Sequence, residues 1–363
     1  MMSRTLLLLL LVSSVTLSCT PKAYVYQEPP QVKGDWETST LAKAKLPEAS
    51  LVEMVNQTRQ GHYKNIHSIL LVKDGKLVLE EYFHGHNAQT LHDLRSTTKS
   101  ITSLLVGLGI QKKHLPNELQ TIPTYLPKYA KRLTGKKRSI TLQHLLTMSS
   151  GLDCNDHNPN SPAQEDKMYR TSDWLDFLLK VNMVAEPGKK YSYCTGGVVL
   201  LGAILQQASN MSIPSFAQKY LFGPLGITKV KWSPAAPKGY TDTGGHLYLR
   251  PRDMAKIGWF VHQNGMWNGK SVLSSSWFGK IKNPYHAPQG YSYLWWYKKA
   301  RNQATGTTYT IHHSSGNGGQ FIYIIPELKL VAVFTGGNYN SPLMNQPINM
   351  LAQHLFKPLA ASK

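Results

Sequence analysis

The stretch that begins at Ser96 constrains the fold of this chain more than any other. Apolar residues follow it with the i, i+3, i+4, i+7 spacing of an α-helix, at Ile101, Leu104, Leu105 and Leu108. This spacing places them on one helical face, which must be buried against other parts of the chain. The sequence therefore predicts a buried helix with Ser96 in its first turn.

Lys99 lies three residues after Ser96, on the same face of the predicted helix. Burial would lower the pKa of Lys99 and leave a neutral amine that can take the serine proton. The helix dipole and the free amide of the first turn would favour an oxyanion beside Ser96. For the tetrapeptide alone, the alternative is a helix-capping serine followed by a solvated lysine.

The first residues are typical of an export signal. Arg4 precedes a short apolar run over residues 6–12, which is too short to span a bilayer. We expect a signal peptide over residues 1–18, lipidation of Cys19 with simple cleavage as the alternative, and a tether over residues 19–45. The expected location is the bacterial cell envelope, either in the periplasm or anchored to a membrane as a lipoprotein.

After removal of the signal and Cys19, only Cys154 and Cys194 remain, so the chain is not a disulfide scaffold. An oxidising envelope would let these two cysteines pair if the fold brings them close together. Two free thiols are the alternative. The sequence leaves this question open.

The chain has 40 Lys and Arg residues against 20 Asp and Glu residues, and the excess is spread along its length. For an exported protein, this distribution argues against nucleic acid as a partner. It favours anionic lipid, cell-wall polymer or acidic substrates, with general solubility as the alternative. A membrane would be contacted only through the lipid anchor.

Segments with the composition of β-strands occur near both ends of the chain, and helical patterns fill the middle. The expected strands cover residues 67–72, 77–83, 309–313, 321–325 and 330–334. The order predicts an α+β fold with an antiparallel sheet flanked by helices and interrupted by a helical insertion. We expect one domain over residues 46–363, with its sheet part at about 46–110 and 235–363 and its helical part at about 111–234.

Two further segments carry chemical groups. Tyr193 lies on a loop directly before an apolar helix, where a phenol can relay protons, although most tyrosines only pack under turns. Residues 313–320 are rich in glycine, so their backbone can approach a ligand and donate a second amide to an oxyanion. A plain hairpin loop is the alternative for this segment.

Together, these segments resemble the class C-like branch of the serine β-lactamase and penicillin-binding-protein superfamily. The matching pieces are Ser96-Thr97-Thr98-Lys99, Tyr193-Cys194-Thr195, Ser314-Ser315-Gly316 and the leucine-rich framework segment at 145–152. Thr195 and Ser314 stand where class C β-lactamases have asparagine and lysine. Residues 193–197, 293–296 and 316–320 are instead similar to 6-aminohexanoate-dimer hydrolase and related carboxylesterases, which are amidases and esterases.

The resemblance implies a serine hydrolase for small amide or ester substrates, with an acyl-enzyme on Ser96, Lys99 as base and Tyr193 as proton relay. It places the oxyanion between the backbone amides of Ser96 and Asn317. Thr195, Ser314, Ser315 and Gly316 would contact substrate, and Tyr169 and Trp296 would border the acyl pocket.

No cofactor is implied. No metal is expected either, because the chain lacks a His-Glu-x-x-His run and its 14 histidines show no ligand spacing. Two alternatives remain open, a D-alanyl peptidase or weak β-lactamase, and a non-catalytic envelope binding protein of the same fold.

Overall fold

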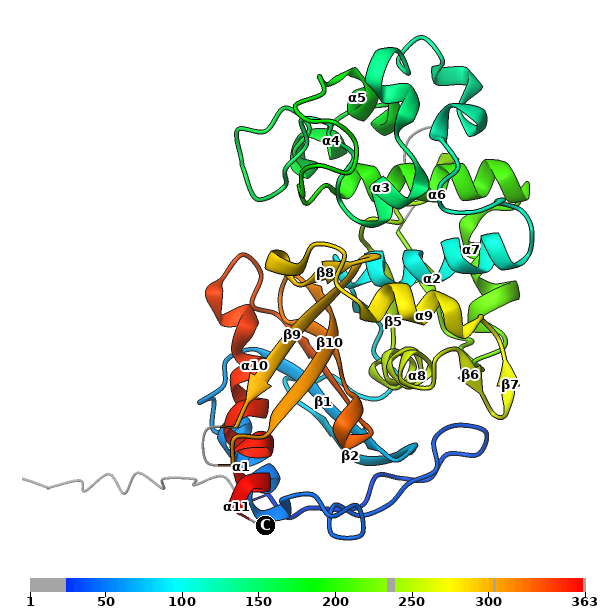
Figure 1. Ribbon diagram of the computed structural model, residues 1–363. Helices are drawn as coiled ribbons and strands as arrows, with labels where there is room; N and C mark the ends of the chain where they lie inside the picture. Colours follow the sequence, from blue (N-terminus) through cyan, green and yellow to red (C-terminus); the bar gives the residue numbers. More distant parts are fainter. Residues whose placement is uncertain (1–23, 234–238, 303–304, 362–363) are drawn as a thin grey trace, which may run out of the picture.

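The computed structural model describes residues 24–233, 239–302 and 305–361. Figure 1 shows a sheet with helices on both faces and, at one end of it, a helical region. The predicted signal peptide and Cys19 lie outside the described residues. Within the described ranges, no helix is both long enough and apolar enough to cross a bilayer.

The main sheet joins the two ends of the chain. Its strand order is β2-β1-β12-β11-β10-β9-β8, and neighbouring strands run antiparallel. The strands are β1 (Ile66–Lys73), β2 (Lys76–Tyr82), β8 (Tyr291–Ser292), β9 (Trp295–Arg301), β10 (Thr308–Gly316), β11 (Gln320–Ile325) and β12 (Leu330–Gly336). The N-terminal hairpin pairs with the C-terminal strands through β1 and β12, so the predicted α+β fold is confirmed.

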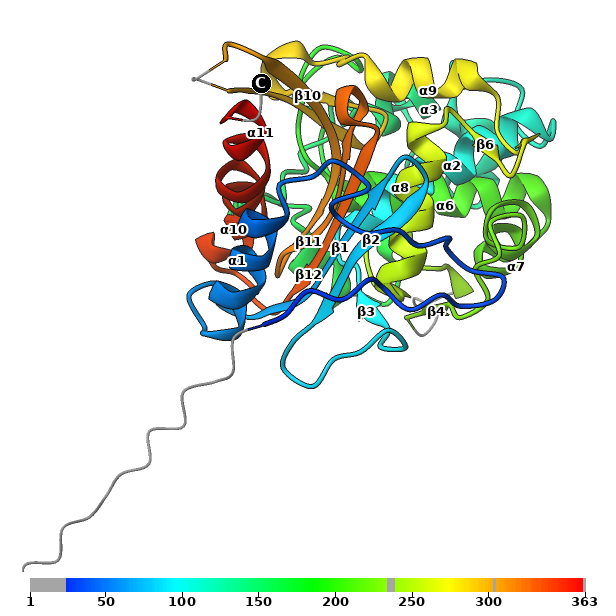
Figure 2. The ribbon, with the colours of Figure 1, turned by 90° about the horizontal axis from the view of Figure 1, so that it is seen from below.

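Alternating side chains of the sheet enter two separate apolar cores. In β1, Leu70 and Val72 face one core, while Ile69 and Leu71 face the other. Helices α1 (Glu48–Arg59), α10 (Gln346–Leu351) and α11 (Pro358–Ala361) cover one face of the sheet, and α2 (Thr97–Gln111), α8 (Pro251–His262) and α9 (Ser275–Lys282) lie on the other side (Figure 2). Helix α2 is therefore enclosed on all sides, as the apolar stripe after Ser96 predicts.

The helical region packs over α2. Its α-helices are α3 (Leu142–Leu146), α4 (Glu165–Tyr169), α5 (Trp174–Lys180), α6 (Thr195–Ser209) and α7 (Ile213–Ala217). Short 3₁₀ turns precede them at Ile122–Tyr125, Pro127–Tyr129 and Gly135–Ser139, and a π-helical turn follows at Gln218–Phe222. Further 3₁₀ turns cover Ala287–Gln289, Pro326–Leu328 and Pro342–Asn345, and a second π-helical turn covers Ala352–Phe356.

A small second sheet, in the order β3-β5-β4, supports the segment that leads into α2. Its strands are β3 (His92–Asp93), β4 (Lys231–Trp232) and β5 (Leu247–Leu249), and a separate hairpin contains β6 (Met266–Trp267) and β7 (Lys270–Ser271). The amide of Leu94 donates to the Leu247 carbonyl at 2.8 Å. This sheet therefore fixes the backbone two residues before Ser96.

The segment predicted to be a tether, residues 19–45, is packed against the sheet from Tyr24 onward. Trp36 is 5% exposed, and its indole nitrogen donates to the Arg252 carbonyl at 3.2 Å. Leu41 is fully buried, and Thr38 bridges to Leu77 of β2. The tether prediction is wrong for these residues. Burial of their apolar side chains against the domain lowers the free energy, and a solvated linker would leave these side chains in water.

Candidate active site

Ser96 and Lys99 form a direct contact at the start of α2. The Lys99 Nζ lies 2.9 Å from the Ser96 Oγ and also donates to the Gly244 carbonyl at 2.7 Å. Lys99 is 1% exposed, and the Ser96 side chain makes no capping bond to the helix backbone. The alternative of a capping serine with a solvated lysine is therefore wrong.

An unusual backbone turn presents Ser96. Arg95 has a φ of +49°, a left-handed conformation that is costly for a side chain other than glycine. The Arg95 amide donates to the Asp93 Oδ1 at 3.0 Å, which helps to hold this turn. The strained residue thus stands directly before the serine that meets Lys99.

The pKa of Lys99 differs from the prediction. Burial lowers it, as expected, but nearby negative charges outweigh burial and raise the net pKa above its usual value. The groups that raise it are, in order of effect, Tyr193, Glu165, Asp156 and Asp242. The prediction of a neutral amine is therefore wrong for the free protein, where Lys99 carries its proton at neutral pH.

Tyr193 lies within an aromatic stack at the same site. Its ring stacks on His157, with centroids 5.0 Å apart, and on Trp296 at 6.0 Å. The Lys99 Nζ lies 5.1 Å from the centroid of the Tyr193 ring. Three of the predicted site residues, Lys99, Tyr193 and Trp296, are thus brought together from α2, the loop before α6, and β9.

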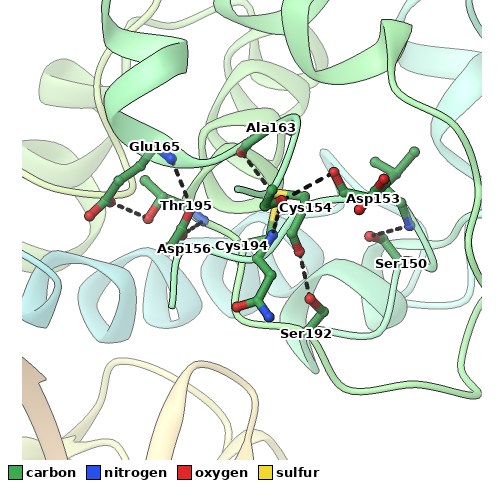
Figure 3. Close-up of a disulfide and its surroundings, with 12 residues drawn as sticks. Ser150, Asp153, Cys154, Asp156, Ala163, Glu165, Ser192, Cys194 and Thr195 are labelled. Carbon is green, nitrogen blue, oxygen red and sulfur yellow. Dashed lines mark hydrogen bonds between the residues drawn. A yellow bond between two sulfur atoms is a disulfide. The ribbon is translucent and has the colours of Figure 1, made fainter. Parts of the chain in front are cut away.

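A disulfide fixes the loop that carries Tyr193. Cys154 and Cys194 are bonded, with Cα atoms 5.5 Å apart (Figure 3). The bond anchors the segment around Asp156 beside the start of α6. The question left open by the sequence is thus answered in favour of pairing.

Replacing Cys154 and Cys194 together by serine is expected to lower the free energy of unfolding by about 2–4 kcal/mol, because the bond closes a loop with a sequence separation of 40. Turnover should also fall, since Tyr193 adjoins Cys194. Urea unfolding of the oxidised wild type and the double variant measures the stability change. Equal stabilities would contradict it.

Two carboxylates surround Thr195, the first residue of α6. The Thr195 amide donates to the Asp156 Oδ2 at 2.5 Å, and its hydroxyl donates to the Glu165 Oε2 at 2.6 Å (Figure 3). The Glu165 amide in turn donates to the Asp156 Oδ1 at 3.0 Å. Thr195 is fully buried within these contacts. The prediction that it contacts substrate is wrong, because its side chain is fully buried and does not line the cavities beside Ser96.

A third carboxylate, Asp242, orders the other side of the site. Its Oδ1 accepts the amides of Gly244 and Gly245 at 3.0 and 2.9 Å, and its Oδ2 accepts the Tyr169 hydroxyl at 3.0 Å. Burial, followed by the charge of Asp242, raises the pKa of Tyr169 well above its usual value. Asp242 thus holds both Tyr169 and the turn whose carbonyl receives Lys99.

The turn between β10 and β11 closes the site. Asn317 exchanges two hydrogen bonds with Asn340: its Nδ2 donates to the Asn340 Oδ1 at 2.7 Å, and its Oδ1 accepts the Asn340 amide at 2.9 Å. Neither the Ser96 nor the Asn317 amide donates to another backbone group among the described residues. Both amides thus remain suited to an oxyanion.

Two of the residues predicted to contact substrate on this turn do not line the cavity. Ser314 is fully buried, on a strand face that points into the protein. A Cβ atom on Gly316 would lie 2.2 Å from the Leu94 carbonyl oxygen. Gly316 therefore lets β10 approach the segment before Ser96, and not a ligand as predicted. Ser315 does line the cavity.

Two cavities adjoin at Ser96. The larger, of about 460 Å³, is lined by Ser96, Tyr193, Trp296, Ser315 and Asn317, together with Asp156, His157, Glu165 and the 340–345 segment. The smaller, of about 160 Å³, adds Tyr169, Arg95 and His246. Six of the predicted residues thus line these two adjoining cavities: Ser96, Tyr193, Trp296, Ser315, Asn317 and Tyr169.

His246 pairs with Asp93 at the rim of the smaller cavity, with its Nδ1 2.8 Å from the Asp93 Oδ2. This hydrogen bond raises the pKa of His246, and it contributes to lowering that of Asp93 against the opposing effect of burial. A raised folded-state pKa adds stability that is present below the unfolded value of about 6.5 and is lost as the pH rises through the folded value. Lowering of the Asp93 pKa adds stability that is lost at acid pH.

The stability difference between wild type and His246→Gln should therefore be larger at pH 6 than at pH 9. Urea unfolding at both values measures it. His262→Gln is a control of opposite sign, because burial lowers the pKa of His262. A difference for His246→Gln that does not change with pH would contradict the assignment.

Sequence reasoning missed the acidic residues of the site. Asp156, Glu165 and Asp242 carry no motif, since each lies in an irregular segment or at a helix start. One signal in the sequence could have indicated Asp156: it lies two residues after Cys154. The Cys154–Cys194 bond brings this segment beside Tyr193. Asp156 and Glu165 come close to Lys99 through packing of the helical region over α2, and Asp242 through the turn that leads into β5.

Comparison with known proteins agrees with this geometry. The family model described as Beta-lactamase matches residues 57–347. Protein flp of Staphylococcus aureus (strain NCTC 8325 / PS 47) is 24% identical over 200 residues, which cover 52% of this chain and 39% of that protein. The 6-aminohexanoate-dimer hydrolase of Paenarthrobacter ureafaciens is 22% identical over 223 residues, covering 58% and 56%.

Among solved structures, a putative 6-aminohexanoate-dimer hydrolase from Bacillus anthracis superposes with a TM-score of 0.68 at 23% identity, covering 84% of this chain and 81% of that one. The chain spans less than two thirds of the length of the curated relatives named above. The resemblance expected from the motifs is confirmed.

Proposed function

Because the chain belongs to the beta-lactamase family, we propose that it is a serine hydrolase that cleaves amide or ester bonds through an acyl-enzyme on Ser96. One observation carries this proposal, the 2.9 Å contact between the Lys99 Nζ and the Ser96 Oγ beside an open cavity. A protein that only binds ligands does not require a buried lysine at its serine.

In the proposed acylation step, the Ser96 Oγ bonds to the substrate carbonyl carbon, and its proton passes to a neutral Lys99 amine. The backbone amides of Ser96 and Asn317 stabilise the oxyanion. Tyr193 relays the proton to the leaving amine or alcohol as the C–N or C–O bond breaks. Water then cleaves the ester on Ser96 and restores the hydroxyl.

Because nearby carboxylates raise the pKa of Lys99, its neutral fraction is small at pH 7 and grows with pH. We expect kcat/KM to rise between pH 7 and pH 9, and Glu165→Gln to move this rise to lower pH. Glutamine removes the charge and keeps an oxygen for the Thr195 hydroxyl. Initial rates over this pH range measure the shift.

Asp166→Asn is the matched control for this prediction. It removes the charge of the next residue, which also lines the smaller cavity but is exposed and is not among the main charges that act on Lys99. Its profile should keep the wild-type position. If the pH dependence of kcat/KM in Glu165→Gln is the same as in wild type, another group must take up the serine proton.

The cavity favours substrates without a carboxylate. Asp156 and Glu165 line the larger cavity, and no lysine or arginine does so within the described chain. Ser314, which stands at the position of the β-lactamase lysine, is buried. In the smaller cavity, Arg95 lies 3.6 Å from the Asp93 carboxylate. We therefore propose neutral or cationic amides and esters as substrates, in preference to β-lactams.

A fluorophosphonate probe tests the proposed function. We expect one adduct on the wild-type chain by intact mass, and none on Ser96→Ala. Esters with and without a carboxylate near the scissile bond then test the substrate class, and fluorescent penicillin tests the β-lactam alternative. A folded wild-type chain that is not labelled would favour a binding protein of the same fold.

We also propose that the chain acts in the cell envelope. The disulfide supports this location, because such bonds persist in oxidising compartments. Fractionation of producing cells, with mass analysis of the mature N-terminus, tests export and lipidation of Cys19. Recovery of the full-length chain in the cytoplasm would contradict the proposal.

A further inference from the structure

Three histidines from separate elements converge at one end of the main sheet. His67 lies in β1, His86 in the loop after β2, and His92 in β3. Each contributes a ring nitrogen, and these three nitrogens all lie within 4.8 Å of one another. Ring centroids are 3.9 Å apart for His67 and His86, 4.9 Å for His86 and His92, and 5.6 Å for His67 and His92.

Other contacts leave this cluster poorly satisfied. The Nε2 of His86 is buried without a hydrogen-bond partner in the described structure. The Nε2 of His92 has the Thr335 hydroxyl at 3.4 Å, a long contact. Buried polar atoms normally have partners, so an unpaired nitrogen on a ring that lies against two other imidazoles needs an explanation.

The charge state of the cluster suits metal binding. Burial, followed by the charges of neighbouring histidines, lowers the pKa of His67 to about 4 and that of His92 to about 3. Burial, followed by the charge of His84, also lowers the pKa of His86. No carboxylate is among the groups that shift these values. These directions favour the neutral ring, the form of imidazole that binds metals, and agree with the geometry of the cluster.

The backbone makes room for this arrangement. A Cβ atom on residue 337 would lie 2.8 Å from the Nε2 of His67, so a glycine at this position leaves space for the ring. The Gly337 amide donates to the Asn65 carbonyl at 2.8 Å, which fixes the strand end beside β1. The position of His67 therefore depends on the strand pairing of the main sheet.

We propose that His67, His86 and His92 bind one divalent transition-metal ion of the zinc class. Imidazole nitrogens bind Zn²⁺ at about 2.0–2.1 Å, so two ligand atoms of one tetrahedral ion lie about 3.3–3.4 Å apart. Binding would draw nitrogens that lie up to 4.8 Å apart closer together by about 1.4 Å, and His86, which lies on a loop, is the ligand best placed to move. The fourth position is left for water.

The metal would act as a cross-link. It would join the loop over residues 83–91 to β1 and β3. His92, which lies four residues before Ser96, pairs with Leu249 of β5. We therefore expect it to stabilise the segment that leads to the nucleophile. It has no part in the proposed hydrolytic steps, so the site can be tested in a Ser96→Ala background.

Cobalt(II) is the probe, because imidazole-bound Co²⁺ absorbs visible light and Zn²⁺ does not. The mature chain, without an affinity tag and stripped with a chelator, is titrated with Co²⁺ and then with Zn²⁺. We expect one equivalent of Co²⁺ to produce a tetrahedral spectrum that Zn²⁺ removes. His86→Gln should weaken binding by at least about tenfold. His62→Gln, which changes an exposed histidine outside the cluster, should bind as wild type does.

Thermal unfolding measures metal binding in a second way, which does not depend on the absorption spectrum of Co²⁺. Zn²⁺ should raise the Tm of wild type and His62→Gln, but not that of His86→Gln, because only a ligand that binds the folded state stabilises it. Circular dichroism checks that His86→Gln is folded. Absence of a bound equivalent in wild type, or undiminished binding in His86→Gln, would overturn the proposal without affecting the proposed hydrolase.

Discussion

Replacing Ser96 by alanine should abolish turnover and leave the fold intact. The loss in kcat should be roughly 10³-fold or more, because removal of a catalytic nucleophile leaves only the contributions of binding and of the oxyanion donors. The Ser96 hydroxyl accepts a bond from Lys99 and does not cap α2. The free energy of unfolding should therefore fall by less than about 1 kcal/mol.

Ser212→Ala is a matched control for the loss of a serine at a helix start. The Ser212 hydroxyl caps α7 by accepting the Ser215 amide at 3.3 Å. Its loss should cost about 1 kcal/mol of stability and leave turnover unchanged. Hydrolysis of an ester substrate by folded Ser96→Ala at the wild-type rate would remove the nucleophile from this position.

Replacing Lys99 by methionine should lower kcat/KM by about 10²-fold or more, the usual contribution of a general base. Methionine fills a similar volume in the buried site and cannot accept a proton. The loss should appear in acylation, which single-turnover stopped-flow measurements separate from deacylation. The rise of kcat/KM above pH 7 should disappear with it.

Lys256→Met separates the catalytic effect from the effect of losing a buried cation. Lys256 is 4% exposed and lies 3.1 Å from Asp35, away from Ser96. This variant should lose stability because it removes one of the two cations that pair with Asp35, the other being Arg252 at 3.3 Å, yet it should keep its turnover. Acylation of Lys99→Met as fast as wild type would show that the lysine only positions Ser96.

Five strands of the main sheet were predictable because they carry local signals, whereas β8 and β9 were not predicted. The β1–β2 hairpin has apolar runs on both sides of the Asp74-Gly75 turn, and the C-terminal strands repeat the pattern. The pairing of β1 with β12 had no local signal, since it joins residues more than 250 positions apart. The presence of strands at both ends of the chain favoured this pairing, because each group of strands alone would leave an exposed edge that the other group can cover.

The candidate site was predictable only in part. Ser96, Lys99 and Tyr193 could be found because their motifs place reactive groups at fixed spacings near helix starts. The state of Lys99 could not, since its pKa depends on carboxylates that come from distant loops. For Thr195 and Gly316, the sequence indicated the correct segment, but burial and close backbone contact decided what each residue does.

Local patterns in the chain were enough to specify the buried helix after Ser96, the strands at both ends and the placement of a nucleophile and a lysine on one helical face. These features follow from periodicity and from spacing within a few residues. The raised pKa of Lys99, the Cys154–Cys194 bond and the cluster of His67, His86 and His92 arise instead from contacts between distant segments. Each of these depends on the distance between groups far apart in the chain, and packing alone sets that distance.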